Sequence, residues 1–212
     1  MGIVAFNWAE GNNNQLTLLM NRDNWVHRDI SGASWNGNGQ ILSGRSADND
    51  GTWFGISRGG RVAFLVSAEI LLDHFDPFFA SELYPIKFLE GNMTPQAFGN
   101  YVAQRGEVGQ LLSFSLIVAD MTLNSMIHIR KPEQAESNVM IQPVPFGVHT
   151  LSPYDGLDSI EPWVIIKYKC LVSRIVRIVH FCKSFFSLFF LFLKSNTLSF
   201  CFWWYYAGFT RV

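Results

Sequence analysis

The stretch Thr52-Trp-Phe-Gly-Ile-Ser-Arg-Gly-Gly-Arg-Val-Ala-Phe-Leu-Val-Ser67 contains two runs rich in aromatic and β-branched residues, separated by three turn-forming residues. Residues 52–57 and 61–67 are therefore predicted to be strands of a hairpin joined through Arg58-Gly-Gly60. A second hairpin is predicted from Ile3–Trp8 and Gln15–Met20, because Gly11-Asn-Asn-Asn14 between them is typical of a turn. The chain thus opens with antiparallel strands.

The middle of the chain carries helical signals. Residues 81–90 form one candidate helix, which Pro85 makes short or kinked. Thr94 followed by Pro95 is typical of a helix start, and Gly106 is expected to end that helix about three turns later. Further strands are predicted at residues 111–119, 125–130, 139–142 and 148–151, and the polar segment that ends at Gly51 is rich in Gly and Asn. This order predicts an α+β domain built mostly from antiparallel sheets.

Charge divides the 212 residues into two regions. Residues 1–161 hold all 17 Asp and Glu with nine of the 16 Lys and Arg, a net charge of −8. The last 51 residues hold seven basic residues and no acid, together with all three cysteines. The first region therefore has no Cys-based zinc site, disulfide or thiol nucleophile. Because the start of the chain lacks a basic and then apolar leader, we expect a cytoplasmic protein.

The C-terminal region, residues 160–212, is atypically hydrophobic and basic, and three interpretations of it stay open. An acid-free, Phe-rich composition is what translation through a uridine-rich intron gives, so the region is interpreted as intron-derived. A folded C-terminal element is the second interpretation. A membrane anchor is the third, although Lys194 interrupts any apolar window of about 20 residues that a spanning helix needs.

Several motifs carry a family resemblance. Asn21-Arg-Asp-Asn24, Gly51-Thr-Trp-Phe-Gly-Ile-Ser57, Phe114-Ser-Leu-Ile-Val-Ala-Asp120 and Gly147-Val-His-Thr-Leu-Ser152 follow a Met1-x-Ile-Val start. In this order the chain resembles the transport and Golgi organisation protein 2 family, the NRDE-motif proteins. It is similar to plant-like members, over residues 1–159, with a divergent or truncated C-terminus. We therefore expect a family domain at 1–159, incomplete at its C-terminal end.

The resemblance implies an architecture like that of N-terminal nucleophile hydrolases, with two stacked antiparallel sheets flanked by helices. In such enzymes a Cys, Ser or Thr at the mature N-terminus attacks an amide while its own amine acts as base. Related proteins have Cys at position 2, where this sequence has Gly2. We therefore expect no catalytic residue and no amide hydrolysis by that route.

Six residues are candidates for binding. Asn21, Arg22 and Asp23 belong to the family motif, in which Arg and Asp can grip a carboxylate or simply pair with each other. Thr52 and Trp53 are interpreted either as packed core residues or as a ligand platform. His149, which lies in a family-like segment, is the preferred haem ligand among His27, His74, His128, His149 and His180.

These observations lead to a hypothesis with two alternatives. By resemblance, the chain is a non-catalytic protein of Golgi organisation and secretion that handles a hydrophobic cargo such as haem or an acyl lipid. The alternatives are an N-terminal nucleophile amide hydrolase and a membrane adaptor anchored by its tail, so Golgi or endomembrane contact stays open. No metal site or other cofactor is expected, and Arg58 and Arg61 are too small a basic cluster to predict a nucleic-acid partner.

Overall fold

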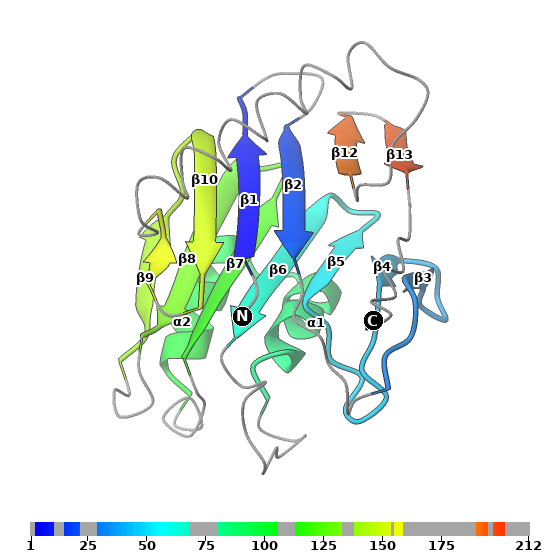
Figure 1. Cartoon of the computed structure of the whole chain (residues 1–212), viewed down its shortest axis with the longest axis horizontal. Helices are drawn as coiled ribbons and strands as arrows, with labels where there is room; N and C mark the ends of the chain where they lie inside the picture. Colours follow the sequence, from blue (N-terminus) through cyan, green and yellow to red (C-terminus); the bar gives the residue numbers. More distant parts are fainter. Residues whose placement is uncertain are drawn as a thin grey trace, which may run out of the picture.

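Two antiparallel sheets are stacked face to face in a computed structural model of the chain (Figure 1). The structure describes residues 3–10, 15–21, 29–67, 80–105, 113–132, 138–153, 155–158, 190–194 and 197–201. Within these ranges the strands outnumber the helices, and every strand pairing is antiparallel. The expected α+β sandwich of antiparallel sheets is confirmed.

The first sheet has six strands in the order β11-β10-β1-β2-β12-β13. Their bounds are Ile3–Trp8 for β1, Leu16–Asn21 for β2, Gly147–Ser152 for β10, Gly156–Leu157 for β11, Phe190–Lys194 for β12 and Thr197–Cys201 for β13. β1 pairs with β2 from Ile3 opposite Asn21 to Trp8 opposite Leu16, as the predicted first hairpin requires. On its other side β1 pairs with β10, which places Phe6 opposite His149.

The second sheet has seven strands in the order β3-β4-β5-β6-β7-β8-β9. Their bounds are Ser34–Trp35, Ile41–Ser43, Phe54–Ser57, Arg61–Ser67, Phe114–Asp120, Ser125–Lys131 and Met140–Pro143, in that order. The predicted hairpin of β5 and β6 is confirmed, with Phe54 opposite Phe64. β3 and β4 lie in the segment before Gly51, to which the sequence analysis assigned no element. They are too short for alternation to show, and β4 is fixed by pairing with β5.

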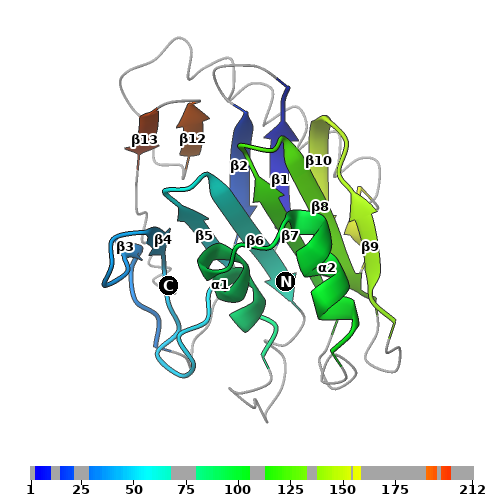
Figure 2. The same cartoon turned by 180° about the vertical axis from the view of Figure 1, so that it is seen from behind.

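Both described helices, α1 (Leu83–Glu90) and α2 (Pro95–Ala103), cover the outer face of the seven-stranded sheet (Figure 2). Pro85 lies in the first turn of α1, where its missing amide proton breaks no helical hydrogen bond. The Thr94 hydroxyl accepts a hydrogen bond from the Ala97 amide at 3.2 Å, so the predicted start of α2 is confirmed.

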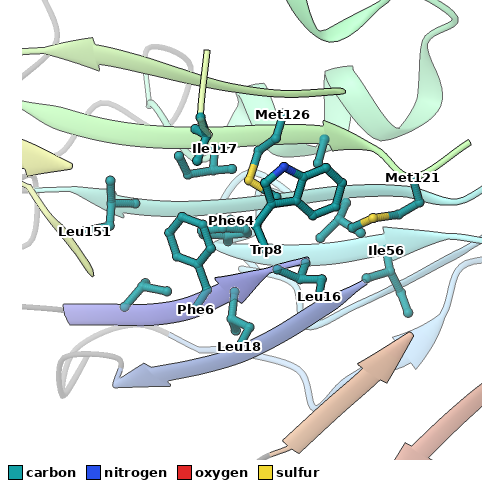
Figure 3. Packing of buried hydrophobic residues seen from close by; sticks show 14 of the residues in the cluster. Phe6, Trp8, Leu16, Leu18, Ile56, Phe64, Ile117, Met121, Met126 and Leu151 are labelled. Carbon is teal, nitrogen blue, oxygen red and sulfur yellow. The ribbon is translucent and has the colours of Figure 1, made fainter. Parts of the chain in front are cut away.

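Alternating side chains of the seven-stranded sheet build two cores. On β8, Ile127 and Ile129 face the helices, while Met126 faces the other sheet. Figure 3 shows the core between the sheets, where Phe6 and Trp8 meet side chains of the opposite sheet. The Phe6 ring lies edge-on to Phe64, with centroids 5.1 Å apart. Burying each such large side chain contributes roughly 1.5–3 kcal/mol, so this layer fixes how the sheets stack.

The C-terminal region contributes the hairpin β12–β13, and β12 pairs with β2, with Leu191 opposite Leu18. No described helix combines the length and apolar character needed to cross a bilayer. The domain boundary at residue 159, the intron origin and the membrane anchor all stay predictions.

Candidate functional site

The family motif lies at the end of β2. Asn21 is the last residue of that strand and pairs with Ile3. Arg22 and Asp23 lie outside the described residues, so their pairing or their grip on a carboxylate stays a prediction.

Thr52 and Trp53 lie just before β5 and form hydrogen bonds with neighbouring segments. The Thr52 hydroxyl lies 2.6 Å from the carbonyl oxygen of Gly44 and 2.9 Å from that of Phe54, and its amide donates to the Glu82 carbonyl at 2.9 Å. Trp53 is buried, and its carbonyl accepts from the Leu65 amide at 2.8 Å. These contacts agree with the packing interpretation, and a ligand platform stays a prediction.

His149 is buried on the face of β10 that looks toward the second sheet. Its Nδ1 lies 2.7 Å from Oδ2 of Asp158, and its Nε2 lies 2.8 Å from the carbonyl oxygen of Pro145. A main-chain carbonyl only accepts, so Nε2 donates to Pro145 in this geometry. Haem ligation by His149 would therefore require one of these hydrogen bonds to break. The ring also packs against Phe6, with centroids 5.2 Å apart.

Asp158, directly after β11, forms hydrogen bonds with β10. Its amide donates to the Thr150 carbonyl at 2.8 Å, and its Oδ1 accepts from the Thr150 amide at 3.0 Å. Gly156, two residues earlier, has φ +85°, a conformation that favours glycine. A Cβ atom there would lie 2.7 Å from Cδ of Arg130 and 3.2 Å from Cε1 of His128. The bare backbone of Gly156 thus lets these two β8 side chains lie against β11.

His128 is buried and neutral at physiological pH. Burial, with a smaller contribution from the positive charge of Arg130, lowers its pKa to about 4, although the negative charge of Asp158 opposes the shift. The Gln142 side-chain amide lies 3.0 Å from Nδ1 and donates to it, so the ring proton is on Nε2. Among the described residues this buried Nε2–H has no hydrogen-bond partner.

Ser115 completes the group from β7. It lies directly opposite Arg130 in the β7–β8 register, on the face that looks toward the first sheet, and it is fully buried. Its hydroxyl likewise finds no hydrogen-bond partner within the part of the chain that the structure describes. We call the residues Ser115, His128, Arg130, His149 and Asp158 the polar corner. Figures 1 and 2 both show β10 stacked over β8 at this side of the sandwich.

Three side chains of the polar corner, Ser115, His128 and Arg130, carry hydrogen-bond donors. A serine hydroxyl, a neutral imidazole N–H and a guanidinium all donate, which suits an anionic or carbonyl group. The described residues contain no cluster of three His, Cys, Asp or Glu side chains that could hold a metal ion.

Sequence reasoning named His149, and His128 among the other histidines, but missed Ser115, Arg130 and Asp158. The alternation of Met126, His128 and Arg130 on one face of a strand was the only local signal. The structure brings His149 to the polar corner, whereas the described contacts of Thr52 and Trp53 include none with it. His27, His74 and His180 lie outside the described residues.

Comparison with known proteins agrees with the resemblance. Residues 1–177 match the family model described as Transport and Golgi organisation 2. No curated protein matches the chain significantly. One similar solved structure is that of a Caenorhabditis elegans N-acylethanolamine-hydrolyzing acid amidase (NAAA) ortholog, with 12% identity, a TM-score of 0.49, and coverage of 73% of this chain and 70% of that chain. By the match over residues 1–177, this chain belongs to the Transport and Golgi organisation 2 family.

Proposed function

We propose that the chain acts in Golgi organisation and protein secretion as a non-catalytic member of its family. The observation that carries the proposal is the family match over residues 1–177, because this is a family of Golgi organisation and secretion. We place the protein in the cytoplasm, in contact with Golgi or other endomembranes through its C-terminal region.

Two features of the residues support a non-catalytic role. Gly2, at the position where related proteins have Cys, has no nucleophilic side chain. The pair of His149 and Asp158 resembles the oriented histidine of a hydrolase, but its Nε2 donates to a main-chain carbonyl rather than accepting a proton from a hydroxyl or thiol. Neither feature offers an activated nucleophile.

The proposed cargo is a hydrophobic small molecule with a carboxylate, either haem or an acyl lipid in its free-acid form. The apolar layer between the sheets and the donors of the polar corner support this choice, because an amphiphile needs both kinds of surface. The motif residues Asn21, Arg22 and Asp23 are proposed to assist binding.

A cell experiment tests the role in secretion. The full chain is expressed in cells that lack their own family member, and Golgi morphology and the secretion rate of a reporter are measured. We expect both to be restored by the wild type and by Arg58→Ala, which changes an exposed arginine, but not by Arg22→Ala. A normal level of wild-type protein without any restoration would contradict the role.

A binding experiment tests the cargo and separates its two sources. Purified full chain is titrated with haemin, followed by the Soret band, and with a fluorescent fatty acid, followed by emission. Saturable binding of one ligand identifies the class, and loss of the Soret shift in His149→Ala would assign the iron ligand. If neither ligand binds saturably, the cargo proposal is wrong. Turnover of amide substrates by the purified chain would instead contradict the non-catalytic role.

A further inference from the structure

Two buried donors of the polar corner, the Ser115 hydroxyl and His128 Nε2–H, share one feature that the packing of the sandwich does not explain. Both lie in the layer between the sheets, and neither has a partner among the described residues. Leaving a buried donor without a partner costs about 1–3 kcal/mol, and native proteins keep few such groups.

The contacts around the His128 ring show which way its free donor points. Nδ1 faces Gln142 on β9, and Cε1 lies nearest to Gly156 on β11. Because Nδ1 and Nε2 flank Cε1 on opposite sides, Nε2 lies on the side of the ring away from β9. That side is toward β7, where Ile117 lies directly opposite His128 and Ser115 lies two residues along the same face.

Arg130 adds a positive charge to the same place. It lies directly opposite Ser115 in the strand register and two residues along β8 from His128, on the same face. Its stem packs against Gly156, and its side chain is only half buried. The stem of Arg130 therefore lies against β11, the last described strand of its sheet.

An acid, Asp158, lies near His128 and opposes the lowering of its pKa. The two carboxylate oxygens of Asp158 are engaged by His149 Nδ1 and by the Thr150 amide. Apolar side chains, including Phe6, Ile117 and Leu151, occupy the rest of the layer next to the corner.

We infer that Ser115, His128 and Arg130 form a subsite for the carboxylate of the hydrophobic cargo, reached at the β11 edge of the sandwich. One carboxylate oxygen accepts from the Ser115 hydroxyl and His128 Nε2–H, and the other accepts from the Arg130 guanidinium. This inference rests on the proposed function, since it assigns the acidic group of that cargo to named residues. It predicts that the protein distinguishes an acid from an alcohol of the same chain.

The test uses the full chain and two fluorescent probes, cis-parinaric acid and the matched alcohol. We expect wild type to bind the acid at least about tenfold more tightly than the alcohol, as charge-assisted hydrogen bonds imply. Arg130→Gln and Ser115→Ala should weaken acid binding while leaving alcohol binding unchanged. Arg58→Gln, an exposed arginine over the Trp35 ring, is the matched control and should keep the full preference.

A second readout guards against a variant that fails to fold. In wild type, the imidazole signals of His128 should shift on addition of the acid but not of the alcohol. Equal affinity of wild type for both probes, or an unchanged acid preference in Arg130→Gln, would overturn the subsite while leaving the cargo proposal standing. Binding of neither probe would overturn an acyl-lipid cargo and the subsite together.

Discussion

The two ends of the layer between the sheets are built on the same strands but differ in chemistry. At one end Leu16, Ile56, Met121 and Met126 pack around the Trp8 ring (Figure 3). At the other end the polar corner places an arginine, two histidines, a serine and an aspartate between β7, β8, β10 and β11. The apolar end stabilises the fold, whereas in the corner the Ser115 hydroxyl and His128 Nε2–H have no partner among the described residues. We infer that stability and binding are separated along one layer.

The largest effect is expected at the apolar end. Leu16→Ala removes a fully buried side chain and should lower the free energy of unfolding by roughly 3–5 kcal/mol, since it loses burial and leaves a cavity. Leu123→Ala is the matched control, because Leu123 is 56% exposed in the turn between β7 and β8. Chemical denaturation measures both variants. A similar loss in the two would contradict the assignment of the stabilising core.

The next effect comes from pH acting on the polar corner. The pKa of His128 is lowered from 6.5 to about 4, so the unfolded chain binds a proton more readily than the folded one between these values. Stability from this residue is complete above pH 6.5, is lost as the pH falls toward 4, and amounts to about 3 kcal/mol. The free energy of unfolding of wild type should therefore fall more steeply in this window than that of His128→Gln. Parallel pH profiles would show that His128 is not buried as described.

Crowding at Gly156 should have a smaller effect. Gly156→Ala adds a methyl group against Arg130 and forces a side chain onto a backbone with φ +85°. We expect a loss of about 2 kcal/mol, of which about 1–2 kcal/mol is backbone strain. Gly39→Ala isolates the strain, because Gly39 has φ +70° with nothing near its added Cβ. An equal loss of stability in both variants would show that the added methyl group at Gly156 is not crowded by Arg130.

Short-range patterns in the sequence predicted individual strands, a hairpin and a helix cap, but not the polar corner. The hairpin of β5 and β6 and the Thr94 cap follow from short-range patterns, as does the alternation of His128 with Ile127 and Ile129. The corner depends on the pairing of β1 with β10, which joins residues about 140 positions apart. No local pattern specifies such a pairing, so Asp158 had no signal of its own, and Ser115 was marked only as part of the motif Phe114–Asp120.

The smallest predicted effect has the opposite sign. Ser115→Ala removes a buried hydroxyl without a described partner, at nearly the same volume, and should raise the free energy of unfolding by about 1 kcal/mol. Thr52→Val is the contrasting control, because the Thr52 hydroxyl has two carbonyl oxygens within reach and its loss should cost about 1 kcal/mol. Denaturant titration of ligand-free protein measures both. A loss of stability in Ser115→Ala would mean that the hydroxyl is already satisfied, and the contrast between the two ends of the layer would then not hold at Ser115.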